Sequence, residues 1–232
     1  MYIKRIIIII VAIGAIVGAI FAYNVYTAVF SDNTAFNNEE AHLYIAPGAT
    51  FETVKADIAP LLKEVSSFET VAKQKGYITN IKPGHYVIKK GMNNNEIINS
   101  IRSKNTPVKV AFNNQERLED LAGRISHQIQ PDSLSLLKAM RDTDFLREHD
   151  FNNATALSMY IPNSYEVFWN SSATSFRDRM FTEYKRFWNE KRLAKAEALQ
   201  MTPAQVYTLA AIVQKETAKV DERPRVAGVY LN

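Results

Sequence analysis

The 232-residue chain has no cysteine and no block of like charges, and it contains no internal repeat. Without cysteine it can form no disulfide, no thiolate zinc site and no cysteine nucleophile. Its 28 basic residues are spread among 24 acidic ones, and the resulting net charge of +4 gives no indication of a nucleic-acid partner. The four histidines lie far apart, without metal-ligand spacing, so we expect neither a metal site nor a cofactor.

A long apolar run occupies the N-terminus. Residues 6–22 carry no charge, and the run extends to Phe30 with only two polar interruptions. About 20 apolar residues cross a bilayer, so residues 1–30 are predicted to form a short tip and a transmembrane anchor. Lys4 and Arg5 precede the run and acidic residues follow it, which places the N-terminus in the cytoplasm. The alternative is a cleaved signal peptide, but no small-residue cleavage site followed by a polar break is present.

The remainder divides into a linker and two domains. The polar, Asn-rich segment 31–41 is predicted to be a linker that lifts the rest of the chain off the membrane. Residues 42–105 are predicted to form a small α+β unit, near the lower size limit for independent folding. Its expected elements are strands at 43–45, 77–81 and 85–88, and helices at 54–62, 67–75 and from Asn93 or Asn94 through residue 101.

The second domain, residues 106–232, is predicted to be mainly helical, so the whole chain belongs to the α+β class. A strand at 108–112 is expected to precede helices at 115–128, 133–141, 175–200 and 203–218. The chain stops within an apolar alternation at 226–231. Because a domain seldom ends inside an element, we expect the C-terminal part of this domain to be missing.

One helix of this domain places a carboxylate on an apolar face. Thr202 and Gln205 match a capping box around Pro203, which predicts where the helix begins. Glu216 shares a helix face with Leu209, Ile212 and Val213. Burial there raises the pKa of a carboxyl group, as a general acid near neutral pH requires. The alternative is a structural glutamate neutralised by a nearby arginine.

A second stretch, residues 161–169, combines polar and aromatic side chains. It reads Ile-Pro-Asn-Ser-Tyr-Glu-Val-Phe-Trp and joins a loop to a strand. Apolar ring faces and amides together are typical of a sugar-binding cleft. A plain turn followed by a core tryptophan, Trp169, explains the same residues.

Together these motifs resemble the YceG-like endolytic murein transglycosylases (MltG). The resemblance lies in residues 211–217 (Ala-Ile-Val-Gln-Lys-Glu-Thr), followed by Asp-Glu-Arg at 221–223 and by 226–232. Residues 161–165 are similar to that family's Phe-Pro-Asp-Thr-Tyr element. Residues 47–49 and 82–86 are similar to its LysM-like subdomain. With the anchor, the resemblance covers nearly the whole chain.

The resemblance implies a membrane-anchored lytic transglycosylase of the inner membrane, with its catalytic domain in the periplasm. Such an enzyme cleaves peptidoglycan glycan strands and leaves 1,6-anhydro-MurNAc ends without water as the nucleophile. The family's catalytic glutamate aligns with Glu216, and one carboxyl group suffices because the substrate supplies the attacking oxygen. Asn163, Tyr165, Gln214 and Asn232 are candidate substrate contacts. The expected partners are glycan strands, the membrane and peptidoglycan synthases.

The chain departs from the family pattern at four positions. Asn163 and Ser164 replace Asp and Thr, Leu157 replaces a frequent Glu, and Gln214 replaces another, which leaves Glu216 as the better acid. Two further hypotheses remain. The chain could be a non-catalytic peptidoglycan-binding scaffold with a structural Glu216, or a glycan hydrolase that uses water and leaves reducing ends. Because the family's remaining cleft motifs lie beyond residue 232, we expect the fragment itself to be inactive.

Overall fold

A computed structural model describes residues 2–231 and begins with one long helix, α1 (Tyr2–Phe30). None of its side chains is buried, and the mean hydropathy of its most apolar 18-residue window is 2.9. The helix is therefore long and apolar enough to cross a membrane. The chain divides into two units. Unit 1 runs to Val108 and includes Phe168–Asn170, and unit 2 comprises Lys109–Val167 and the chain from Ser171 onwards.

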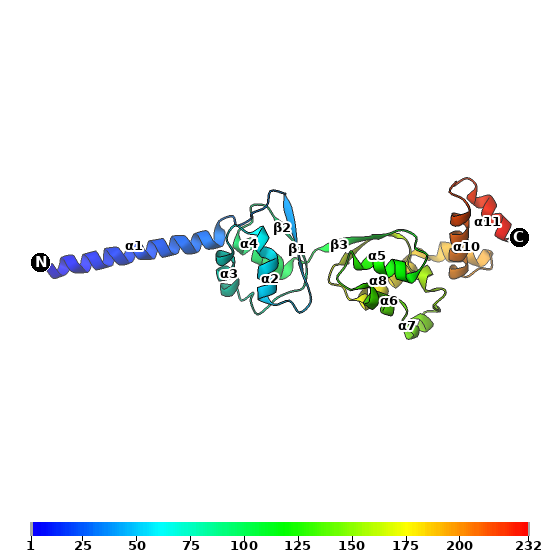
Figure 1. Ribbon diagram of the computed structural model, residues 1–232, viewed down its shortest axis with the longest axis horizontal. Helices are drawn as coiled ribbons and strands as arrows, with labels where there is room; N and C mark the ends of the chain where they lie inside the picture. The colour runs from blue at the N-terminus through cyan, green and yellow to red at the C-terminus, as the bar shows by residue number, and fades with distance from the viewer. Residues whose placement is uncertain (1, 232) are drawn as a thin grey trace. The chain divides into compact units, whose positions relative to one another are not determined.

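Unit 1 is built on two antiparallel strands, β1 (Glu40–Ile45) and β2 (Gly84–Lys89), with Leu43 opposite Tyr86. Its helices are α2 (Phe51–Ile58), the short η1 (Ala59–Leu61), α3 (Val65–Gln74) and α4 (Asn94–Ser103). Figure 1 labels α2, α3 and α4 around the two strands. Apolar side chains from both strands and from α2, α3 and α4 form one core. The predicted LysM-like character of this unit stays a prediction.

Local sequence explains where these elements begin and end. Asn93 and Glu96 form a capping box at the start of α4, and Gly76, with φ +64°, follows the last turn of α3. The strand predicted at 77–81 is absent. Tyr77 is fully buried, and the amide of Asn80 donates to the Tyr77 carbonyl at 2.9 Å. That turn reverses the chain, so this segment cannot extend as a strand.

Unit 2 combines a two-stranded sheet with helices. Strand β3 (Pro107–Phe112) pairs with β4 (Asn163–Phe168). The remaining elements are α5 (Leu118–Ser126), α6 (Ser133–Met140), α7 (Thr143–Glu148), η2 (Ala156–Met159), α8 (Ala173–Phe187), α9 (Glu190–Ala198), α10 (Pro203–Glu216) and α11 (Arg223–Leu231). Helix α6 packs against both α5 and α8.

One expectation for unit 2 was wrong, and one sequence pattern was ambiguous. The helix predicted over 175–200 is two helices, because Trp188 leaves helical geometry with ψ 61° and the Asn189 side chain caps α9 by accepting from the Arg192 amide at 3.1 Å. The apolar alternation at 226–231 lies in a helix, α11. Alternation over so few residues does not distinguish a strand from a short helix.

Candidate active site

Helix α10 carries the motif that the sequence singles out. Its capping box is formed: the Thr202 amide donates to the Gln205 side chain at 2.8 Å, and the Gln205 amide donates to Thr202 Oγ1 at 3.3 Å. Thr217 ends the helix in extended geometry, and its hydroxyl donates to Glu222 at 2.8 Å. The short turn that follows leads into α11, which packs against α10.

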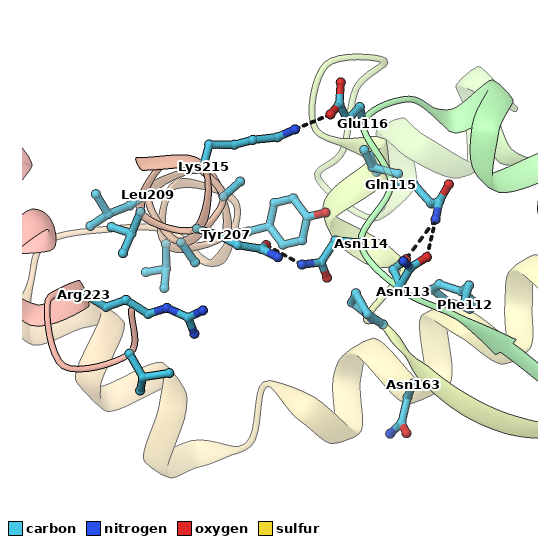
Figure 2. Close-up of a pocket in the computed structure, with 18 of the residues that line it drawn as sticks. Phe112, Asn113, Asn114, Gln115, Glu116, Asn163, Tyr207, Leu209, Lys215 and Arg223 are labelled. Carbon is cyan, nitrogen blue, oxygen red and sulfur yellow. Dashed lines mark hydrogen bonds and ion pairs between the residues drawn. The ribbon is translucent and has the colours of Figure 1, made fainter. Parts of the chain in front are cut away.

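An open groove of about 1580 Å³ lies within unit 2, beside α10. Residues 111–116, residues 162–164, one side of α10 and the first turn of α11 line it. Pockets for small molecules measure roughly 300–1,000 Å³, so a groove of this size suits an extended ligand such as a polymer. Figure 2 shows the loop after β3 on one side, α10 on the other, and the Arg223 side chain directed towards the space between them.

Polar side chains cross this groove in two places. The Asn114 amide donates to the Gln214 side chain, and Lys215 pairs with Glu116. Lys215 holds the pKa of the Glu116 carboxyl below its usual value. The Nε atom of Arg223 is buried and has no hydrogen-bond partner among the described residues. The groove therefore offers amides and one carboxylate to a ligand.

Glu216 is not among the residues that line the groove. Its side chain is exposed, and Oε1 accepts a hydrogen bond from the Tyr230 hydroxyl at 3.1 Å. This bond raises the pKa of Tyr230. The predicted burial of Glu216 among aliphatic side chains is wrong, because Glu216 is the last residue of α10 and only Val213 among its apolar neighbours is buried. The predicted catalytic role does not depend on burial alone and stays a prediction.

The predicted substrate contacts lie in different surroundings. Asn163 and Gln214 are exposed and line the groove. Tyr165 is buried, its hydroxyl donates to the Ile161 carbonyl, and burial raises its pKa to about 12. It lies in the core beside Phe112, at 5.7 Å between ring centroids. Asn232 lies outside the described residues.

The other wall of the groove was not predicted from sequence. The run Asn-Asn-Gln-Glu at 113–116 follows β3 directly and supplies its polar side chains. Four consecutive polar residues between a strand and a helix were the available signal. Trp169 belongs to unit 1, where its ring contacts Tyr44 at 5.2 Å between centroids. Within residues 2–231 no three His, Asp or Glu side chains form a group that could hold a metal ion.

Comparisons with known proteins point to one family. The model of the YceG-like family matches residues 43–232, which is most of the chain. No curated protein matches. Among solved structures, a putative YceG-like protein from Listeria monocytogenes is 19% identical, and the match covers 81% of this chain and 67% of that chain, with a TM-score of 0.49.

Proposed function

The chain belongs to the YceG-like family, and on that premise we propose that it is a lytic transglycosylase. Its substrate is the glycan strand of peptidoglycan, and the bond cleaved joins MurNAc to GlcNAc. Glu216 is the general acid and base. The observation that carries this proposal is the family match, which includes α10, with the Glu216 motif at its C-terminal end, and all of α11.

The chemistry needs one carboxyl group. In its protonated form, Glu216 gives a proton to the glycosidic oxygen as the bond to C1 breaks. The resulting carboxylate then takes the proton of the MurNAc C6 hydroxyl while that oxygen bonds to C1, which closes a 1,6-anhydro ring and restores the acid. Positioned acid–base groups contribute about 10²–10⁴-fold to a rate.

The surroundings of Glu216 support this role in two ways. Its exposed carboxyl is open to a polymer, and the Tyr230 hydroxyl at 3.1 Å fixes its orientation from α11. The groove beside it carries Asn163 and Gln214, whose amides can bond sugar hydroxyls and N-acetyl groups. A glycan strand bound along the groove excludes water from the end of α10, and that supplies the desolvation that the free protein lacks.

The remaining parts of the chain have roles in the same proposal. Helix α1 anchors the protein in the inner membrane with its N-terminus in the cytoplasm, because Lys4 and Arg5 lie at its N-terminal end, ahead of the apolar run. Unit 1 acts as a LysM-like module, and both units lie in the periplasm next to the cell wall. Peptidoglycan synthases are partners that supply the strands.

A second candidate function has an observation in its favour. Glu216 is exposed and does not line the described groove, as expected of a structural glutamate. In that case the protein is a non-catalytic peptidoglycan-binding scaffold of the cell-wall synthesis machinery, and its groove binds glycan without cleaving it.

Purified sacculi separate the two functions. The protein is incubated with sacculi, and the released muropeptides are identified by mass spectrometry. The transglycosylase yields anhydro ends, and Glu216→Gln abolishes them because an amide cannot supply the proton. Glu197→Gln is the matched control, since Glu197 is exposed on α9 of the same unit.

Each outcome has a distinct meaning. Reducing ends in place of anhydro ends would indicate hydrolysis by water. Sacculus binding without any release would support the scaffold. Loss of activity in Glu116→Gln combined with full activity in Glu216→Gln would assign the acid to the groove wall instead of to α10.

A further inference from the structure

The end of α1 is joined directly to unit 1. Residues 2–26 of the helix are exposed, whereas Thr27, Ala28 and Val29 are partly buried. Helix α1 contacts α3 and α4 there, and the Asn94 side-chain amide donates to the Ala28 carbonyl at 2.7 Å. Asn94 is the first residue of α4. A backbone acceptor in the last turn of α1 is thus bonded to the first turn of a helix of unit 1.

A buried pair of asparagines closes this junction. Asn33 and Asn94 are 4% and 1% exposed, and the Asn33 amide donates to Asn94 Oδ1 at 2.7 Å. Asn94 also donates to Ser67 Oγ at 2.9 Å, and Asn33 exchanges hydrogen bonds with the backbone of Glu64 at 2.8 and 2.7 Å. Breaking such a pair leaves buried polar groups unsatisfied, at about 1–3 kcal/mol for each.

The backbone after α1 is fixed as well. The backbone N–H of Asn33 donates to the Met92 carbonyl at 3.0 Å, and the backbone N–H of Lys63 donates to the backbone carbonyl of Asn33 at 3.1 Å. Thr34 is buried and forms a bridge with Leu62. The segment predicted to be a linker, 31–41, is therefore bonded into unit 1 within three residues of the helix end.

The length of α1 places this junction in the membrane. A hydrocarbon core of about 30 Å takes roughly 20 helical residues, which from Ile6 end at Val25. Ala28 lies three residues further, about 4.5 Å along the axis. Each headgroup layer is about 5–8 Å thick, so the hydrogen bond from Asn94 to Ala28 lies at headgroup depth.

The side chains near this depth suit an interface. Tyr26 and Phe30 lie one turn apart on α1, both exposed, with ring centroids 5.3 Å apart. Aromatic rings concentrate where hydrocarbon meets headgroups. Lys63 is half exposed beside Asp32, and the Lys90 ammonium reaches the Asn37 carbonyl at 3.3 Å. Both lysines can contact lipid phosphates while they keep these partners.

We propose that the α1-facing end of unit 1, formed by residues 31–34 and the first turns of α3 and α4, is seated in the phospholipid headgroup layer. The short connection 31–33, which the Asn33–Asn94 pair bonds into unit 1, locks unit 1 to α1, so that the anchor and unit 1 form one body. Unit 1 then has a fixed depth and orientation at the membrane surface. The proposal is independent of the catalytic role of Glu216.

Two matched serine positions test the seating. Ser66 is exposed in the first turn of α3, and Ser103 is exposed in the last turn of α4, nine residues or about 13.5 Å from its start. Because the chain has no cysteine, Ser66→Cys and Ser103→Cys each give one site for a fluorescent label. The full-length protein is reconstituted in phosphatidylcholine vesicles that contain lipid with a nitroxide on its headgroup.

Seating predicts a strong loss of fluorescence at position 66 and little loss at position 103. Equal, weak quenching at both positions would overturn the proposal. A flexible Gly-Ser insertion after Phe30 tests the lock while it leaves the Asn33–Asn94 pair intact. If α1 holds unit 1 down, quenching at 66 falls to the level at 103. Quenching that persists would show that unit 1 binds headgroups by itself and would refute the lock.

Discussion

Gly84→Ala tests the close packing at the start of β2. A Cβ atom on Gly84 would lie 2.5 Å from Oδ1 of Asn105 and 2.6 Å from its Cγ. Asn105 cannot move freely, because Oδ1 accepts from the His85 amide and Nδ2 donates to Asn170, both at 3.0 Å. We expect about 1–3 kcal/mol from overpacking and about 0.5–1.5 kcal/mol for each of the two hydrogen bonds.

A central loss of about 4 kcal/mol corresponds to a fall of about 8–16 °C in the unfolding temperature of a chain of this size. The protein has two tryptophans, so Trp188→Phe leaves Trp169, which contacts Tyr44, as the fluorescent reporter of unit 1. Thermal unfolding of the full-length protein in detergent, followed by this fluorescence, gives the shift.

The matched control is the same substitution in open space. Gly123 lies inside α5, and no atom within 4 Å would meet its Cβ. Gly123→Ala should stabilise unit 2 by about 0.5–1 kcal/mol, because alanine favours helix. It is measured through Trp188 in a Trp169→Phe background. An unchanged unfolding temperature for Gly84→Ala would refute the reasoning, since Asn105 would then have room to move.

Three further predictions concern stability, measured by the same thermal unfolding. Arg177 is 6% exposed, pairs with Asp142 and Asp178, and stacks on the Phe145 ring. Arg177→Ala should therefore lower the free energy of unfolding by about 2–4 kcal/mol. The control, Arg147→Ala, removes an exposed ion pair on α7 and should cost about 0–0.5 kcal/mol. Burial lowers the pKa of His85 below its usual value of 6.5. As the pH falls from 7 to 5, the unfolded chain therefore takes up a proton before the folded protein does, and unit 1 should lose stability. His85→Gln should flatten this dependence of the unfolding temperature on pH. Thr202→Ala removes the cap of α10 and should cost about 1 kcal/mol, and Thr202→Ser should retain most of it.

The sequence predicted elements well where a local signal was strong. The apolar run of α1, the capping box at Thr202 and the capping asparagine before α4 each fixed a helix. Local patterns failed where tertiary contacts decide. Tyr77 reads as a strand residue, but its ring is buried in the core and the chain turns after it.

The candidate site was also predicted only where the local sequence carried a signal. Membership of the YceG-like family followed from motifs, and Asn163 and Gln214 do line one groove. The exposure of Glu216 was not predictable from helical periodicity, because periodicity assigns a face and not what covers it. The Asn114–Gln214 contact joins residues 100 positions apart, and no spacing rule connects them.

The chain enters unit 1 a second time, and this affects how the protein can be divided. Phe168–Asn170 belong to unit 1, where Asn170 bonds both Asn105 and the Pro83 carbonyl. A fragment that ends at residue 105 has its strands and helices but lacks this returning tripeptide. Cutting the chain at one peptide bond therefore removes Phe168–Asn170 from unit 1 together with the whole of unit 2. A fragment designed to contain unit 1 alone must include both of its segments of the chain.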